Sequence, residues 1–463
     1  MATMQAPSLR VASRSQTYVV AAFVALAMLL GGGGSPNPSA EVALQLAAAI
    51  AVAAYWWFGR EQDKAPLPLA VIGVSALVLA VPIAQLIPLP PQIWHDLPGR
   101  SREIAALALV DAQDSWMPLS IAPHKTLASL LAMIPPLALA WMVATRTTRE
   151  RGAILGSVAL MALAGAILGT LQMAGPGDGF KLYADAHPGW LTGFHANRNA
   201  AADILLIGAV AAAGCYAISA DRARWDHRIT LGSTVLVLGA ALLFTGSRAG
   251  IALVPIAAFG MLVMFAGSMA EHRFGPWALA IAAISALVIL TAGLALFDSR
   301  LAYVATRFGM TDDFRLELWQ DSFAALSASW PWGTGMGTFV EAFLPYERLD
   351  VVDLTMPNRA HNEYLEFAIE AGIPGLLVLV AIAGILVHLA IRAWHSQPQL
   401  RAAPIFGLTS FILIALHALV DYPLRNMAEA CLAGVALGML VRPRDDNASG
   451  APGSGIKSLE DNK

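Results

Sequence analysis

The transition that organises this chain reads NRAHNEYLEFAIEAGIPG over residues 358–375, where a long polar interval gives way to an apolar segment. At 100° per residue, the spacing predicts a helix in which His361 shares one face with Tyr364, Leu365 and Ala368. A histidine at the polar start of a membrane helix lies at the water boundary, where a neutral imidazole can accept a proton. The pattern therefore indicates a candidate catalytic histidine.

A plainer interpretation of the same stretch is a polar, glutamate-rich helix start with a capping Asn. Glu363, Glu366 and Glu370 fall together on roughly the face opposite His361. A turn is expected at 372–375, where the sequence reads GIPG. Both interpretations remain open from this stretch alone.

Composition places the chain among membrane proteins. Its 463 residues are 57% hydrophobic and 13% charged, whereas soluble domains average about 25% charged residues. Many apolar runs approach the length that spans a bilayer as a helix, so we predict an all-α integral membrane protein. The net charge of -3 and the lack of a basic stripe argue against a nucleic-acid partner. Cys215 and Cys431 both lie in apolar runs, which indicates neither a disulfide framework nor a thiolate metal site.

Hydropathy predicts about twelve spans, the first of which we expect to be retained rather than cleaved. They cover residues 17–34, 40–58, 68–87, 124–145, 151–173, 197–219, 229–246, 247–267, 276–297, 361–391, 402–420 and 426–442. Lys and Arg recur at alternate connections, and the positive-inside rule then places both termini in the cytoplasm.

Three longer intervals, 88–123, 174–196 and 298–360, would face outward. We expect a short amphipathic helix in the first. The third, the periplasmic loop before the tenth span, should be helical around 314–326 and broken at 331–337. The expected organisation is N-terminal spans within 1–190, a membrane domain over 191–442 that includes this loop, and a disordered cytoplasmic tail over 443–463.

Arginines at the outer boundary are candidate anion ligands. Arg248 lies in GSRAG (246–250), between two spans with almost no loop. An arginine at that depth is costly without a partner, and phosphate suits its planar donor fork. The alternative is an arginine that only extends to the interface. Arg198 and Asn199 follow a candidate capping residue, Asn197, and a helix N-terminus with an Arg is a plausible anion site.

Further candidates lie on the same side. Arg315 and Trp319 are at i and i+4 in the long loop, so Arg315 either binds phosphate or stacks on Trp319. His417 and Asp421, also at i and i+4, form either an Asp-oriented His or a local structural pair. Arg300, Arg307 and Arg359 compete with Arg315 for the anion role. We expect His195 to be an ordinary interfacial histidine.

The chain has no Walker loop and no HExxH or Asp-x-Asp metal cluster, so we expect no nucleotide, metal or other cofactor. Its spans carry few charges, with Asp203 the clearest. A coupled transporter usually places polar groups at the midplane. A polar cluster at one boundary favours an interfacial enzyme that acts on an amphiphile.

The arrangement resembles the bacterial O-antigen ligase family, whose superfamily also contains O-antigen and exopolysaccharide polymerases and pilin oligosaccharyltransferases. The resemblance covers about 190–440 and is most specific around His361. The motifs are GFxxNxN at 193–199, SRxG at 247–250, RxxxW at 315–319 followed by GxGxG at 333–337, and HNxxLxxxxExGxxG at 361–375.

The resemblance implies transfer of a glycan from an undecaprenyl-diphosphate carrier to a hydroxyl acceptor, in the periplasm, by a multi-pass inner-membrane enzyme without a metal. His361 would assist proton removal, and Arg248 and Arg315 would bind the diphosphate. We group Arg198 and Asn199 with the donor-binding residues. The residues expected to support the site are Asn362, Glu370, His417 and Asp421. A single base without an enzyme nucleophile predicts inversion at the anomeric carbon.

The acceptor stays open at this stage. A lipid A–core sugar would make the protein a ligase, a growing polysaccharide a polymerase, and a protein hydroxyl an oligosaccharyltransferase. A transporter of the same lipid-linked glycans and a non-catalytic scaffold are the non-enzymatic alternatives.

Overall fold

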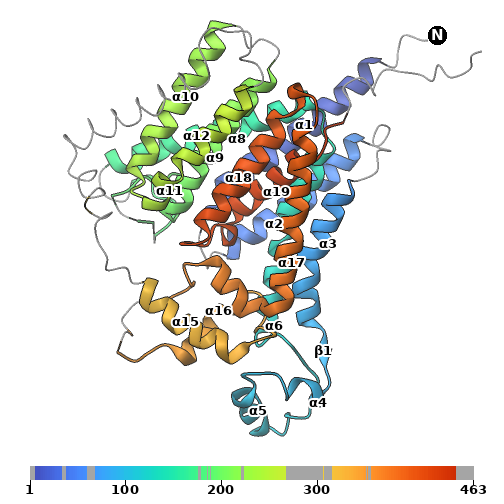
Figure 1. Ribbon diagram of the computed structural model, residues 1–463, viewed down its shortest axis with the longest axis vertical. Coiled ribbons are helices and arrows are strands. Elements are labelled where there is room, and N and C mark those ends of the chain that lie inside the picture. The colour runs from blue at the N-terminus through green and yellow to red at the C-terminus, as the bar shows by residue number, and fades with distance from the viewer. Residues whose placement is uncertain are drawn as a thin grey trace, which may run out of the picture.

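The computed structural model describes residues 6–33, 38–59, 68–175, 179–184, 186–187, 189–219, 224–266, 306, 315–350, 352 and 356–444. Long helices lie side by side in one bundle, and a smaller helical part lies at the end of the bundle near α15 and α16 (Figure 1). The predicted all-helical class is confirmed for these residues, apart from one pair of two-residue strands.

The bundle is built from helices that follow the predicted apolar segments. They are α1 (Ala6–Leu30), α2 (Pro38–Gly59), α3 (Leu69–Leu86), α6 (Pro123–Ala132), α7 (Ile134–Ala144), α8 (Thr148–Ala174), α9 (Arg198–Ile218), α10 (Trp225–Phe244), α11 (Arg248–Ala252), α12 (Val254–Ala266), α17 (Glu363–Trp394), α18 (Ala402–His417) and α19 (Met427–Leu440).

Eight segments in the described part of the chain are helical, long and apolar enough to cross a membrane. Three shorter apolar helical segments, Arg14–Leu30, Ala402–His417 and Met427–Leu440, coincide with the first and the last two predicted spans. Together these segments account for eleven of the twelve predictions, while 276–297 lies outside the described residues. The total of twelve crossings and their orientation therefore remain predictions.

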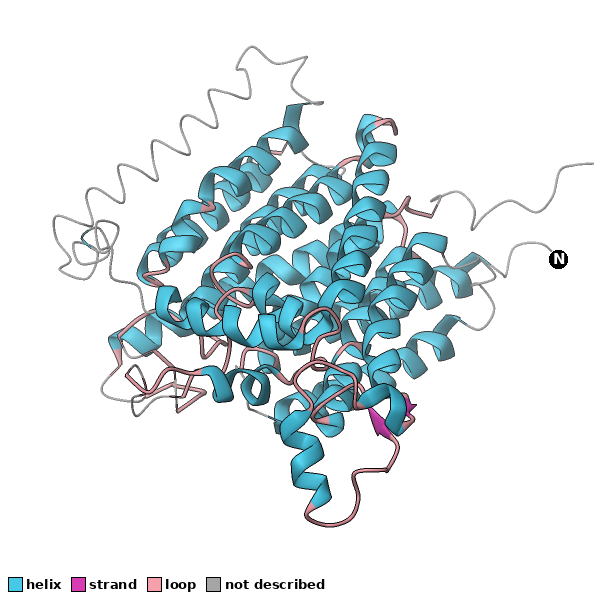
Figure 2. Cartoon of the chain, turned by 60° about the horizontal axis from the view of Figure 1, so that its bottom comes forward, coloured by secondary structure: helices cyan, strands magenta, loops and turns pink. Residues whose placement is uncertain are grey.

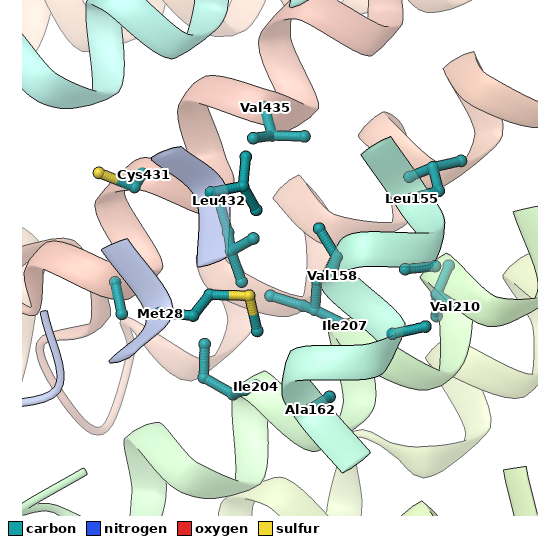
Figure 3. Close-up of a cluster of buried hydrophobic side chains, with 14 of the residues drawn as sticks. Met28, Leu155, Val158, Ala162, Ile204, Ile207, Val210, Cys431, Leu432 and Val435 are labelled. Atoms are coloured by element: carbon teal, nitrogen blue, oxygen red, sulfur yellow. The ribbon is translucent and has the colours of Figure 1, made fainter. Parts of the chain in front are cut away.

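Helix α9 forms the centre of the bundle. It is apolar on nearly all sides and packs against α8, α10, α12 and α18, as a helix surrounded by other helices should. A Cβ at Gly208 would collide with Ala162 of α8, so a small residue is needed for the two helices to approach. Figure 3 shows this core. Its labelled residues are Met28, Leu155, Val158, Ala162, Ile204, Ile207, Val210, Cys431, Leu432 and Val435.

Three predicted spans are interrupted in the structure. The span at 124–145 divides into α6 and α7 next to Pro135, and the span at 247–267 divides into α11 and α12 next to Pro255. Proline lacks the N–H that would continue the helical ladder, which explains both breaks. The third interruption is in α17, where Gly372 adopts φ 56° and ψ -158° and kinks the helix.

Smaller elements gather at the end of the bundle where α17 begins. In the 88–123 interval, β1 (Pro88–Leu89) pairs antiparallel with β2 (Met117–Pro118) around α4 (Pro91–Trp94) and α5 (Ser101–Ala108). Figure 2 brings this end forward and shows the strands in magenta beside the loops. The helix predicted around 314–326 is α15 (Arg315–Ser329), followed by α16 (Phe339–Phe343) and the 3₁₀ helix η1 (Leu344–Tyr346).

The predicted break at 331–337 is confirmed, and this glycine-rich loop packs against the kink in α17. Thr334 and Gly335 donate their N–H groups to the carbonyls of Ile369 and Glu370, at 3.1 and 2.9 Å. A Cβ at Gly372 would collide with the backbone of Pro331 and Trp332. Glycine is therefore required at residue 372 by both its positive φ and this close approach.

At the opposite end of the bundle, the fully buried side chain of Arg151 links the C-terminal ends of α7 and α19. Its guanidinium donates to the carbonyls of Ala144 and Arg146 after α7, at 3.0 and 3.1 Å. It also donates to Met439 and Val441 at the end of α19, at 3.2 and 2.6 Å. One cation thus satisfies carbonyls at the ends of two helices, where unpaired acceptors are otherwise left over.

We predict that Arg151→Met lowers the free energy of unfolding by about 3–5 kcal/mol, because it leaves several buried carbonyls without a donor. Thermal unfolding of the purified protein in detergent measures the loss. Arg149→Met, at an exposed position in the same turn, is the control and should be close to wild type. Equal stability of the two variants would contradict this role for Arg151.

Candidate active site

His361 lies outside the helix that the sequence predicted for it. Helix α17 begins at Glu363, and Asn362 is the capping residue, whose side-chain oxygen accepts the N–H of Leu365 at 3.0 Å. His361 itself has φ 49°, a left-handed conformation that is uncommon for residues other than glycine. The prediction that His361 shares a helix face with Tyr364, Leu365 and Ala368 is therefore wrong. Because Asn362 caps the N-terminus of α17, His361 precedes the helix and does not share its periodicity.

The backbone before His361 is held from two directions. The Ala360 N–H donates to Oε2 of Glu366 at 3.0 Å, and the Trp319 indole N–H donates to the Ala360 carbonyl at 2.9 Å. Trp319 belongs to α15, so the loop helix is attached directly to the residue before the histidine. These contacts stabilise the unusual backbone conformation of His361.

The His361 ring faces Asp421, in the turn between α18 and α19. Its Nδ1 lies 3.3 Å from Oδ1 of Asp421, and its ring centre lies 5.0 Å from that of Tyr422. The His361 side chain keeps 22% of its surface exposed, whereas that of Asp421 keeps 6%. If the proton of the neutral ring is on Nδ1, facing the carboxylate, Nε2 carries the lone pair that can accept a proton.

The groups around Asp421 favour its ionised form. Its Oδ2 accepts from the side-chain amides of Asn199 and Asn197, at 2.5 and 3.3 Å. Burial alone would raise the pKa of Asp421. The His361 contact, the His417 ring and the Asn199 amide outweigh burial and lower this pKa to about 2. A buried carboxylate of this kind can orient His361 and stabilise its protonated form.

The predicted pairing of His417 with Asp421 is wrong in its partners. His417 Nδ1 lies 2.6 Å from Oδ1 of Asp203, and both side chains are 1% exposed. The two residues are spaced as a local pair in the sequence, but each has another partner. The carboxylate of Asp203 in α9 lies beside His417, and the imidazole of His361 lies beside Asp421. Asp203, His417, Asp421 and Glu429 line one small pocket. The site thus contains two His–Asp pairs, with only the His361 pair reaching the surface.

Asn199 connects Asp421 to Arg248. Its side-chain oxygen accepts the Ser247 hydroxyl at 2.8 Å, and the same Ser247 oxygen caps α11 by accepting the Gly250 N–H at 3.1 Å. Arg248 is the next residue and is half-buried. The predicted helix cap at Asn197 is also confirmed, because its Oδ1 accepts the Asn199 N–H at 2.8 Å. The starts of α9 and α11 are therefore fixed relative to the His361–Asp421 pair.

Arg198 is stacked on an aromatic ring beside this junction. Its guanidinium carbon lies 5.3 Å from the Trp190 ring centre. The Trp190 ring packs on Gly246, where φ is 63° and a Cβ would collide with the indole. Trp190 therefore contacts both segments that carry the candidate arginines, Arg198 in α9 and Arg248 in α11.

Arg315 begins α15 and is half-buried. Its charge acts on the His417 ring, which places it near the same pocket. The predicted alternative, a stack of Arg315 on Trp319, stays a prediction; the Trp319 indole N–H itself donates to the Ala360 carbonyl at 2.9 Å. Of the competing arginines, Arg300 and Arg307 lie outside the described residues. Arg359 is paired with Glu366 at 2.8 Å.

The glutamates of α17 share one face, as predicted, and that face is buried. Glu363, Glu366 and Glu370 all approach Arg425, in the 3₁₀ helix η3 (Pro423–Arg425). Sequence reasoning missed Arg425, because nothing in the local sequence connects it to glutamates more than 50 residues away. Among the described residues, no group of three or more His, Cys, Asp or Glu side chains is arranged to hold a metal ion.

Comparison with known families bears on this arrangement directly. The O-antigen ligase family model matches residues 233–380. Over these residues the chain is similar to the O-antigen ligase family. The match supports a membrane enzyme of the O-antigen ligase and polymerase superfamily, which acts on lipid-linked glycans. No curated protein shows a significant match to the sequence.

The matched O-antigen ligase region contains Arg248, Arg315, His361 and Glu370. Asn199, Asp421 and the other residues before 233 or after 380 lie outside it. The contacts of Asp421 with His361 and Asn199 nevertheless join these outer segments to the matched region in one site. The candidate site is therefore assembled from three separate parts of the chain.

Two further histidines lie near the site. His195 is 3% exposed, and burial lowers its pKa to about 4. It lines a separate, mostly apolar pocket, and its position at the membrane interface stays a prediction. His187 is exposed, lies within electrostatic range of Arg198, Asp421 and His361, and was not singled out from the sequence.

The depressed pKa of Asp421 predicts a pH-dependent stability. Because the folded pKa, about 2, is below the ordinary value of 3.8, the ionised carboxylate stabilises the fold above pH 4. This contribution disappears as the pH falls toward 2. We expect Asp421→Asn to lower the free energy of unfolding by about 2 kcal/mol at neutral pH and by less at pH 3.

Thermal unfolding at both pH values, with the exposed Asp96→Asn as control, measures this difference. A penalty for Asp421→Asn that is the same at pH 7 and pH 3 would show that the charge of Asp421 does not stabilise the fold.

Proposed function

We propose that the protein is a bacterial inner-membrane glycosyltransferase that moves a glycan from an undecaprenyl-diphosphate carrier to a hydroxyl acceptor. The preferred acceptor is lipid A–core, as for an O-antigen ligase. The observation that carries the proposal is the His361–Asp421 pair, held beside arginine-bearing helix starts in a chain with an O-antigen ligase domain. A polymerase of the same superfamily is the second candidate, because the family match supports either.

His361 would act as the general base. Nε2 accepts the proton of the acceptor hydroxyl while the acceptor oxygen forms a bond to the anomeric carbon. The bond from that carbon to the diphosphate oxygen breaks, and its electron pair leaves with the diphosphate. Asp421 stabilises the imidazolium, which later releases its proton to water. A positioned base of this kind contributes about 10²–10⁴-fold to the rate.

The arginines would hold the departing diphosphate. Arg198 and Arg248 each directly follow the capping residue of a helix, α9 and α11. A cation in that position opposes the helix dipole, and an anion bound at the helix start would be attracted by both the dipole and the cation. Guanidinium groups placed in advance can stabilise the developing negative charge without reorganisation. Asn199 would support them by fixing the starts of α9 and α11.

Charge distribution supports a periplasmic site. The connections at the other end of the bundle carry Arg146, Arg149 and Arg151, and the C-terminal end of α17 carries Arg392. Lys and Arg gather on the cytoplasmic side of membrane proteins. Both termini would then be cytoplasmic, and His361 would face the periplasm.

The decisive experiment uses the purified protein in lipid with an undecaprenyl-diphosphate glycan, EDTA and no nucleotide. Mass spectrometry follows the products with lipid A–core and with carrier-linked repeats as alternative acceptors. Glycan on the core would establish a ligase, and lengthened carrier-linked chains a polymerase. Donor binding without transfer to either acceptor would favour a transporter and contradict the proposal.

We predict that His361→Ala lowers the rate of transfer by at least about 10²-fold, because the acceptor hydroxyl loses its base. Donor binding and thermal unfolding should stay close to wild type. The control is His395→Ala, at the other end of α17, which should transfer normally. Wild-type transfer by His361→Ala would remove the histidine from the mechanism.

Arg248→Lys should reduce kcat/KM for the donor by about tenfold, because an ammonium group does not reproduce the two parallel hydrogen bonds of a guanidinium to a diphosphate. Arg392→Lys, exposed at the far end of α17, is the matched control. Steady-state kinetics with varied donor concentration give the comparison. Unchanged donor kinetics in Arg248→Lys would exclude Arg248 from the diphosphate site.

A further inference from the structure

Three buried glutamates and two arginines form a network behind the His361–Asp421 pair. Glu363, Glu366 and Glu370 lie on the first turns of α17 with 0–12% of their side chains exposed. Arg425 and Arg359 are 12% and 13% exposed. Buried charges are costly unless they are paired and hydrogen-bonded, so the geometry of these pairs is tightly determined.

Arg425 is the centre of the network. Its Nη2 donates to Oε2 of Glu370 at 2.5 Å, and its Nε lies 3.5 Å from Oε1 of Glu366 and 3.8 Å from Oε1 of Glu363. Oε1 of Glu366 also accepts from Nη1 of Arg359 at 2.8 Å. One carboxylate, Glu366, therefore lies between two guanidinium groups.

The network is attached to the backbone on both sides of the pair. On the His361 side, Oε2 of Glu366 accepts the Ala360 N–H at 3.0 Å. On the Asp421 side, Arg425 lies four residues further along the same turn, and Oε2 of Glu363 accepts the Leu424 N–H at 3.1 Å. The Glu363 N–H also donates to the carbonyls of Ala418 and Asp421, at 2.9 and 3.2 Å.

We propose that Arg425 and Glu366 are positioning residues that set the contact between His361 and Asp421. The proposal rests on the proposed function, since it assigns these residues to the same site. Glu366 fixes the segment that carries His361 by accepting the Ala360 N–H. Arg425 belongs to the turn that carries Asp421, so the ion pair between Arg425 and Glu366 holds the two segments together. Neither residue touches the substrate in this account.

Arg425 and Arg359 are poor candidates for diphosphate binding. Three carboxylates face these two guanidinium groups, so their charge is already balanced within the protein. Drawing Arg425 toward a diphosphate would leave buried carboxylates without a cation, which is strongly unfavourable.

The positional role predicts a particular kinetic pattern. Arg425→Lys and Glu366→Gln should each lower kcat by about 10–100-fold, because a displacement of about 1 Å at a reacting group can cost that much. Donor affinity should stay within about twofold of wild type, since the arginines that bind the diphosphate are unchanged. In a His361→Ala background, neither substitution should lower the residual transfer further, because residues that act as a unit are not additive.

A second readout does not depend on activity. Diethyl pyrocarbonate modifies accessible imidazoles, and peptide mass spectrometry gives the rate at His361 relative to the exposed His395. Loosening the contact with Asp421 should raise this ratio several-fold in both variants. Arg348→Lys, which alters an ion pair between the exposed Arg348 and Asp321 (2.7 Å), is the matched control and should change neither the ratio nor kcat.

The outcomes separate the two proposals. If the wild-type protein transfers no glycan, the proposed function fails, while the labelling ratio still tests the network. An unchanged ratio in Arg425→Lys and Glu366→Gln would overturn the positioning role even if transfer is lost. Loss of cooperative unfolding in both variants would also overturn it, because the network would then maintain the fold rather than the site.

Discussion

Three carboxylates are buried at the start of α17, and their need for cations joins that helix to the turn before α19. Arg425 satisfies them from one side and Arg359 from the other. Arg425 belongs to the segment that carries Asp421, and Arg359 to the segment that carries His361. The ion pairs that neutralise the carboxylates therefore also place the imidazole beside the aspartate. The glycine loop packs against the Gly372 kink of the same helix. Helix α15 is attached through the hydrogen bond from Trp319 to Ala360, whose N–H donates to Glu366 of α17. The polar end of the bundle is thus organised around one buried helix start.

Features with local periodicity or local capping were predictable from the sequence. The apolar segments, the cap at Asn197, the helix after residue 314 and the shared face of the three glutamates all follow from rules that involve neighbouring residues. The breaks at Pro135 and Pro255 had a visible signal as well. Proline within an apolar run interrupts the helical ladder, so both breaks follow from a local rule.

Features set by long-range pairing were not predictable. His417 and Asp421 have the spacing of a local pair, yet their partners are Asp203 and His361, which lie 214 and 60 residues away in the chain. Arg425 has no local indication of its role, since η3 is a single turn between apolar helices. The position of His361 outside α17 depends on Asn362 taking the cap, although Asn358 in the same stretch could also have served. Only the packing of α9, α17 and α19 decides among these alternatives.

In the proposed reaction, His361 removes a proton while the acceptor attacks the anomeric carbon directly. Its most direct test is the configuration of the new glycosidic bond. NMR of the donor and of the product, made by the purified protein in lipid, gives the configuration of the transferred sugar before and after reaction. A single displacement assisted by His361 and Asp421 predicts inversion. Retention of configuration would require a glycosyl intermediate on the protein and would contradict this account.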